Sequence, residues 1–205
     1  MKEKDIVMAA KVLSAVFNPF FLPVVGLVAL FIFSYLSLLP WAAKLYILIL
    51  VATFTILLPT TLIRIFRRWR GWSREDFAVR ERRIVPYIIT IICYLLCYHI
   101  ITTNHIPYTI GSIVMASLII YVVCAIINHW WKISSRTAAI GGVAGAIMAF
   151  AEIFSFNPLW WLCIIILLAG MVGTSRIILG QHTLAQVVTG FLLGMACAIL
   201  AVLFI

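Results

Sequence analysis

The sequence predicts an all-α protein, a polytopic transmembrane helical bundle of about six to seven spans that forms a single integral membrane domain, 1–205. Of the 205 residues, 65% are hydrophobic and only 10% are charged, and the mean hydropathy is +1.20, whereas a soluble domain is about half apolar and about a quarter charged. The apolar runs approach the ~20 residues that a membrane-spanning helix needs, and they lack the alternation of barrel strands. This composition excludes a disordered chain and a nucleic-acid-binding surface.

Seven candidate spans follow one another, separated by breaks that carry proline, tryptophan or charge. They lie near 13–36, 41–63, 85–103, 107–128, 137–156, 158–174 and 183–205. The first span follows a mixed-charge N-terminus and is interrupted by Pro19 and Pro23. Because no small-residue cleavage pattern is present, we expect this segment to be retained.

Small and aromatic residues indicate how the spans pack and where they end. Tryptophans at the breaks predict interfacial belts: Trp130, Trp131, Trp160 and Trp161. Glycines within two late spans predict close helix packing: Gly141, Gly142, Gly145, Gly190 and Gly194. The five cysteines lie inside apolar runs without zinc-ligand spacing, so we expect neither a metal site nor a disulfide framework.

The positive charge is distributed very unevenly between the two ends of the predicted spans. Since loops two crossings apart share a side, the N-terminus, 64–83, 129–136 and 175–182 face the same way. That side holds fourteen of the fifteen Lys and Arg residues. The positive-inside rule makes it cytoplasmic, in a multi-pass protein expected in a bacterial inner (plasma) membrane. The net charge of +9 therefore predicts contact with membrane lipids and phosphorylated groups, and not with nucleic acid.

The arginine-rich stretch 64–83 contributes most of this charge. Its eight arginines are interleaved with Trp69 and Trp72, a pattern typical of a headgroup-contacting loop or an interfacial helix. The alternative is that Arg82 or Arg83 contacts a phosphorylated substrate. Glu152, the only acidic residue within a span, is costly in lipid, so we expect it to face the bundle or a polar partner.

The motif with the clearest chemical meaning lies between the last two spans. Ser175-Arg176, five further residues and His182 form the pattern S-R-x5-H. This pattern resembles the third signature, S-R-x5-H-x3-D, of the type 2 phosphatidic acid phosphatase superfamily, whose fold is shared with vanadium haloperoxidases. Upstream, Lys132-Ile133-Ser134-Ser135-Arg136 resembles the second signature, P-S-G-H, and Arg80 to Pro86 lies where the first, K-x6-R-P, would fall. The resemblance implies an acid-phosphatase/haloperoxidase-like core at 80–190.

The resemblance also implies roles for individual residues. His182 corresponds to the histidine that attacks phosphorus, and an imidazole is a competent nucleophile near neutral pH. The phosphate-binding residues would be Arg176, Ser134, Ser135, Arg136 and Lys132, with Arg82 or Arg83 as further candidates. Arginine matches phosphoryl oxygens in geometry, and a helix start supplies backbone N–H donors. This donor set needs no metal and no cofactor.

Two residues depart from the family pattern. Gln186 stands where the family has aspartate; four residues after His182, its amide oxygen is placed to accept an imidazole N–H. Arg136 stands where a histidine protonates the leaving oxygen, and arginine cannot act as an acid. A phosphate leaving group hardly needs that proton, whereas a lipid alkoxide does. The substitutions therefore favour cleavage of a diphosphate or a loss of turnover.

The sequence thus supports one leading hypothesis and two alternatives. The leading one is an integral membrane lipid-phosphate or polyprenyl-diphosphate phosphatase with a histidine nucleophile, whose partners are its phosphorylated lipid substrate and the membrane lipids. The first alternative is a catalytically impaired relative that binds or translocates a phosphorylated lipid. The second is a small transporter, for which Glu152 is the main indication. The lipid headgroup, chain length and oligomeric state stay open.

Overall fold

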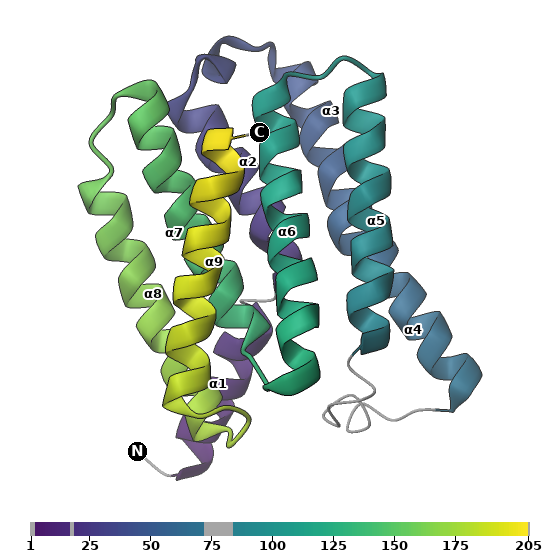
Figure 1. Ribbon diagram of the computed structural model, residues 1–205, viewed down its shortest axis with the longest axis vertical. Helices are drawn as coiled ribbons and strands as arrows, with labels where there is room; N and C mark the ends of the chain where they lie inside the picture. Colours follow the sequence, from purple (N-terminus) through teal and green to yellow (C-terminus); the bar gives the residue numbers. More distant parts are fainter. Residues whose placement is uncertain (1–2, 17–18, 72–83, 205) are drawn as a thin grey trace.

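The computed structural model describes residues 3–16, 19–71 and 84–204, and in these ranges the chain is helical with no strand. Figure 1 shows the elements as a bundle of roughly antiparallel helices. They are α1 (Glu3–Val16), η1 (Pro19–Phe21), α2 (Leu22–Phe33), η2 (Tyr35–Leu38), α3 (Trp41–Ala52), η3 (Thr53–Leu57), α4 (Leu58–Arg70), α5 (Ile84–Thr103), α6 (Tyr108–Trp130), α7 (Ser135–Phe154), α8 (Leu159–Ile178) and α9 (Leu184–Phe204).

Six continuous helices in the described ranges are long and apolar enough to cross a membrane, which confirms the predicted class of polytopic helical bundle. They are Trp41–Arg70, Ile84–Thr103, Tyr108–Trp130, Ser135–Phe154, Leu159–Ile178 and Leu184–Phe204. The phosphatase-like core expected at 80–190 stays a prediction.

The first predicted span, 13–36, is wrong as a continuous helix. The chain divides there into α1 and α2, and the apolar helical stretch Pro19–Ile32 is shorter than a full span. Proline lacks the N–H of a helix interior, where it kinks or breaks the helix, and is best accommodated in a first turn. Pro23 accordingly occupies the first turn of α2. Leu27 and Leu30 of α2 are fully buried, so this helix forms part of the interior of the bundle.

The second predicted span, 41–63, is longer in the structure than in the prediction. The helix runs from Trp41 to Arg70 with a π-helical turn, η3, at its middle, and Gly71 ends it with a φ of 66°. Pro59 lacks the N–H that would bond the carbonyl of Thr55, and the wider turn precedes it. The first four arginines of 64–83 therefore lie on a helix, and the other four lie outside the described residues.

The turns alternate between the two ends of the bundle as the sequence predicts. The start of α1, the end of α4 and the α6–α7 and α8–α9 turns lie at one end in Figure 1, and the chain's C-terminus lies at the other. We call the first of these the basic end, since Lys11, Lys132, Arg136, Arg176 and the arginines of α4 belong to it. Lys44 belongs to the opposite end, where its Nζ donates to the Ser37 carbonyl at 2.5 Å.

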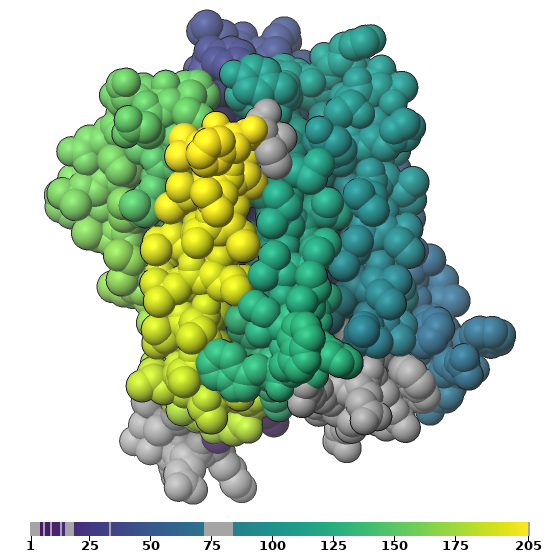
Figure 2. All heavy atoms as spheres, in the orientation of Figure 1, coloured from purple at the N-terminus to yellow at the C-terminus, as the bar shows by residue number. Residues whose placement is uncertain are grey.

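Helices α7 and α9 approach each other along the predicted glycine seam. A Cβ at Gly141 or Gly145 would overlap backbone atoms of Phe191 or Met195, and one at Gly194 would overlap the Ala138 carbonyl. These three glycines are therefore packing residues, as expected. On the other side of α9 lies α6, and Figure 2 shows the two helices side by side on one face.

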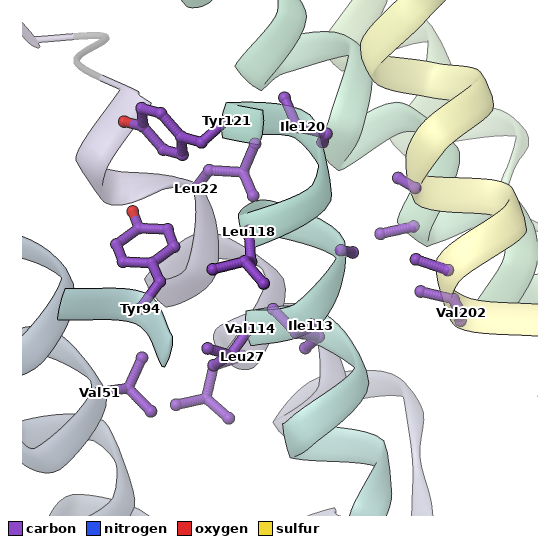
Figure 3. Close-up of a cluster of buried hydrophobic side chains, with 14 of the residues drawn as sticks. Leu22, Leu27, Val51, Tyr94, Ile113, Val114, Leu118, Ile120, Tyr121 and Val202 are labelled. Carbon is purple, nitrogen blue, oxygen red and sulfur yellow. The ribbon is translucent and has the colours of Figure 1, made fainter. Parts of the chain in front are cut away.

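The interior is built around α6, to which α2, α5 and α9 all pack. Figure 3 shows Leu22, Leu118, Tyr94 and Tyr121 gathered at this core. Tyr94 is fully buried, and its ring meets that of Tyr121 edge to face at 5.3 Å between centroids. Tyr121 also lines the cavity described below, whereas Tyr94 does not.

Exposed tryptophans occur near both ends of the bundle, in agreement with the predicted belts. Trp130 and Trp160 are exposed, at the end of α6 and the start of α8 respectively. Glu152 is exposed and does not face the bundle, so that part of the expectation is wrong, whereas contact with a polar partner stays a prediction. It lies two residues before the end of α7, where a carboxylate can reach the interface with water.

Candidate functional site

A cavity of about 260 Å³ lies at the basic end and brings together residues from η1, α5, α6, α7 and the α8–α9 region. Its polar side is formed by Ser134, Ser135, Arg136, Arg176 and His182. Its other side is largely aromatic or apolar, with Phe20, Pro86, Tyr87, Thr90 and Tyr121. Five of the residues that the sequence motifs single out, from segments about forty residues apart, therefore line one cavity.

The two arginines of the cavity converge on a single oxygen atom. Arg176 lies in the last turn of α8 and is only 7% exposed, and its Nη1 donates to Ser14 Oγ at 3.0 Å. Arg136, in the first turn of α7, donates to the same oxygen through its own Nη1. Ser14 comes from α1 and is buried. Two guanidinium groups from different helices can thus reach one acceptor, which is the geometry that binds a phosphoryl oxygen.

His182 is held by Gln186 at the start of α9. The Nδ1 atom of His182 lies 3.1 Å from Gln186 Oε1, and the backbone N–H of Thr183 donates to the same oxygen at 3.2 Å. In return, the backbone N–H of Gln186 donates to Thr183 Oγ1 at 3.4 Å. This reciprocal pair is a capping box, which explains why glutamine stands at this position.

The capping box also determines the tautomer of the imidazole. A backbone N–H can only donate, so the Gln186 atom that it reaches must be the amide oxygen. That oxygen accepts from His182 as well, which places the imidazole proton on Nδ1. In the neutral imidazole the lone pair is then on Nε2, the nitrogen that a nucleophilic role requires. His182 is buried at 8% exposure and lines the cavity.

Ser134 connects the start of α7 to α9. Its side-chain oxygen caps α7 by accepting from the Thr137 N–H at 3.5 Å, and its backbone N–H donates to the Gln186 carbonyl at 3.4 Å. Its backbone donor is therefore engaged in joining α7 to α9. Ser134 and Ser135 both line the cavity, and their part in phosphate binding stays a prediction.

Of the remaining phosphate-binding candidates, the structure describes Lys132 and not Arg82 or Arg83. Lys132 is half-buried in the turn before α7 and is not among the lining residues. Its position two residues before the N-cap of α7 explains this, because the chain turns into the helix only at Ser134. Arg82 and Arg83 lie outside the described residues. In the part of the chain that the structure describes, no three His, Cys, Asp or Glu side chains gather into a metal-binding group.

Two residues of the site escaped the sequence motifs. Ser14 is separated from Arg136 by 122 positions and from Arg176 by 162, and nothing in its own neighbourhood marks it. Tyr121 lies in the middle of an apolar span, where a tyrosine is an ordinary core residue. Comparison with family models, with curated proteins and with solved structures found no match for the chain.

Proposed function

We propose that the protein is an integral membrane phosphohydrolase that acts on phosphorylated lipids, with polyprenyl diphosphates preferred over lipid monophosphates. The observation that carries this proposal is the convergence of Arg136 and Arg176 on one oxygen in the cavity that also contains His182. A phosphoryl group fits this arrangement, because its oxygens match two guanidinium groups while its phosphorus stays accessible to an imidazole.

The proposed reaction has two steps. The lone pair of His182 Nε2 forms a bond to phosphorus while the bond between phosphorus and the leaving oxygen breaks, and the electron pair departs with that oxygen. Water then attacks phosphorus, the N–P bond returns its pair to Nε2, and inorganic phosphate is released with a proton passed to solvent. Arg136 and Arg176 stabilise the charge on the phosphoryl oxygens in both steps.

Gln186 supports the first step without supplying charge. Its oxygen accepts the Nδ1 proton and orients the ring, but a neutral amide stabilises the developing imidazolium less than a carboxylate does. In a serine-protease triad, replacing the orienting aspartate by asparagine lowers turnover about 10⁴-fold through the wrong tautomer. Here the capping box fixes the amide oxygen toward the ring, so the tautomer penalty does not apply.

The leaving group determines the preferred substrate. The site has Arg136 where the family has its acid, and a guanidinium does not release a proton near neutral pH. General acid catalysis contributes typically 10²–10⁴-fold. A departing lipid monophosphate has a second pKa near 6 and needs little protonation. A diphosphate substrate therefore avoids most of the loss of rate that the missing general acid causes.

The test is phosphate release by the purified protein in lipid nanodiscs. We expect turnover of a polyprenyl diphosphate to exceed that of phosphatidic acid, and His182→Ala to abolish both. His129→Ala is the matched control, since His129 is exposed at the same end, meets Trp130 edge to face and does not line the cavity. Arg136→His should raise monophosphate hydrolysis more than diphosphate hydrolysis. Full activity of His182→Ala would refute the proposal.

A second candidate function is binding or translocation of a phosphorylated lipid without turnover. The presence of Arg136 and Gln186 in place of a histidine and an aspartate favours it, because these residues retain binding but lose acid and charge support. In that case the purified protein hydrolyses neither substrate. It still binds the phosphorylated lipid, and Arg176→Ala weakens this binding.

A further inference from the structure

The hydroxyl group of Tyr121 has no assigned purpose in the reaction above. This residue lies on α6, is 6% exposed, and lines the cavity together with Arg136, Arg176 and His182. Its hydroxyl oxygen is buried and has no hydrogen-bond partner within 3.5 Å among the described residues, although the Tyr94 hydroxyl interacts with it at longer range. A buried hydroxyl without a partner is costly, whereas a phenylalanine would fill the same space without that penalty.

The ring of Tyr121 is fixed by three other aromatic rings. It stacks on Phe20 at 6.3 Å between centroids and meets Tyr87 and Tyr94 edge to face at 6.2 Å and 5.3 Å. Phe20 and Tyr87 also line the cavity. The hydroxyl is therefore held in place before any ligand arrives, which is the condition under which a donor stabilises charge with little reorganisation.

We propose that the Tyr121 hydroxyl donates a hydrogen bond to a phosphate oxygen of the ligand, as a third binding group beside Arg136 and Arg176. This inference rests on the proposed function, because it takes the cavity to be a phosphate site. A phenol supplies a neutral donor, so it adds directionality where two guanidinium groups already supply positive charge. Its ligand is then an anion that carries several acceptor oxygens, as a diphosphate does.

The neighbouring tyrosine provides a matched control. Tyr94 lies on α5 and is fully buried, and its hydroxyl likewise has no hydrogen-bond partner within 3.5 Å among the described residues, although it interacts at longer range with the Tyr121 hydroxyl. It does not line the cavity. Figure 3 shows the two rings near each other at the core, with both hydroxyl groups drawn. Tyr94→Phe and Tyr121→Phe therefore remove the same atom from similar surroundings, and only one of these atoms belongs to a cavity residue.

The experiment measures pyrophosphate binding to the purified protein by calorimetry, with thermal unfolding recorded in parallel. We expect Tyr121→Phe to weaken binding about tenfold or more, because a hydrogen bond to a charged oxygen is lost. Tyr94→Phe should change the affinity less than twofold. Neither substitution should lower the unfolding temperature, since each removes a buried hydroxyl without a partner.

Several outcomes distinguish this inference from the proposed function. Unchanged affinity of Tyr121→Phe, with weaker binding by Arg176→Ala, would overturn the inference alone and assign the hydroxyl to a water in the small adjoining space that Tyr121 also lines. An equal loss of pyrophosphate affinity in Tyr94→Phe would also overturn the inference, because it would show that the effect comes from packing and not from a hydrogen bond to the ligand. Binding that does not depend on Arg176, or no binding by the wild-type protein, would overturn both proposals.

Discussion

Two substitutions of Ser14 should separate stability from anion binding. Alanine should lower the stability and keep the binding, whereas aspartate should raise the stability and weaken the binding. The side chain is buried, and its oxygen accepts from both Arg136 and Arg176. A hydrogen bond to a charged group contributes about 1.5–3 kcal/mol. When Ser14 is replaced by alanine, part of this free energy is regained, because the guanidinium groups can bind water in the cavity. We therefore expect Ser14→Ala to lower the free energy of unfolding by about 2 kcal/mol and to leave pyrophosphate binding in place.

Ser14→Asp has the opposite effect on stability. A carboxylate at this position adds a negative charge within reach of two guanidinium groups, so it should raise the unfolding temperature. The same carboxylate competes with any ligand phosphate for both arginines, and we expect pyrophosphate affinity to fall at least about tenfold. Ser112→Asp is the control, because Ser112 is a buried serine of α6 whose Oγ donates to the Thr109 carbonyl at the other end.

The assay combines thermal unfolding in detergent with pyrophosphate calorimetry on the same preparations. Ser112→Asp should be strongly destabilised, because it buries a carboxylate away from the two arginines. The reasoning is refuted if Ser14→Asp is destabilised as much as Ser112→Asp, or if it binds pyrophosphate as tightly as the wild-type protein. Either result would mean that the two guanidinium groups do not form a shared anion site.

Three further predictions concern the seam, the imidazole and the topology. Gly194→Ala should destabilise the protein by about 1–3 kcal/mol because its Cβ meets the α7 backbone, whereas Gly170→Ala, which meets nothing within 4 Å, should stabilise it by up to about 1 kcal/mol; equal unfolding temperatures would contradict the packing. Gln186→Asp should raise turnover and Gln186→Ala should lower it, as phosphate release will measure; equal rates would exclude an orienting role. With the native cysteines replaced, an impermeant maleimide added outside cells should label Asn104→Cys and not Lys132→Cys, and the reverse pattern would overturn the cytoplasmic assignment.

How well the sequence predicts each feature depends on how local its cause is. Six of the seven predicted spans coincide with long helices, because the hydropathy of a span depends only on the residues within it. The contact between His182 and Gln186 was equally predictable, because residues four apart lie on the same face of a helix. The continuation of the second span from residue 63 to Arg70 was not predicted, because the arginines after the apolar run were assigned to a separate loop or interfacial helix, whereas the spanning helix itself carries them beyond the hydrocarbon.

Features that depend on tertiary contacts were not predictable in this way. Ser14 gains its importance only where α1 meets residues from α7 and α8. Tyr121 differs from any core tyrosine only because a cavity lies beside it. The break in the first span is an intermediate case. Pro19 and Pro23 indicate it in the sequence, whereas the apolar residues on both sides of them predict one continuous span.

The position of the site at the ends of helices follows from the cost of charge in a membrane. Arg176 lies in the last turn of α8, whose carbonyl end favours a cation, and the cavity also contains the first turn of α7, whose N–H end favours an anion. Neither cation lies at mid-span, where a charged side chain costs about 2.5–3.5 kcal/mol or more. Lipid phosphates lie at the same interfacial depth, outside the hydrocarbon core. A phosphate site at this depth therefore needs no displacement of the headgroup into the bilayer, and only the aromatic side of the cavity has to accommodate the first part of the lipid chain.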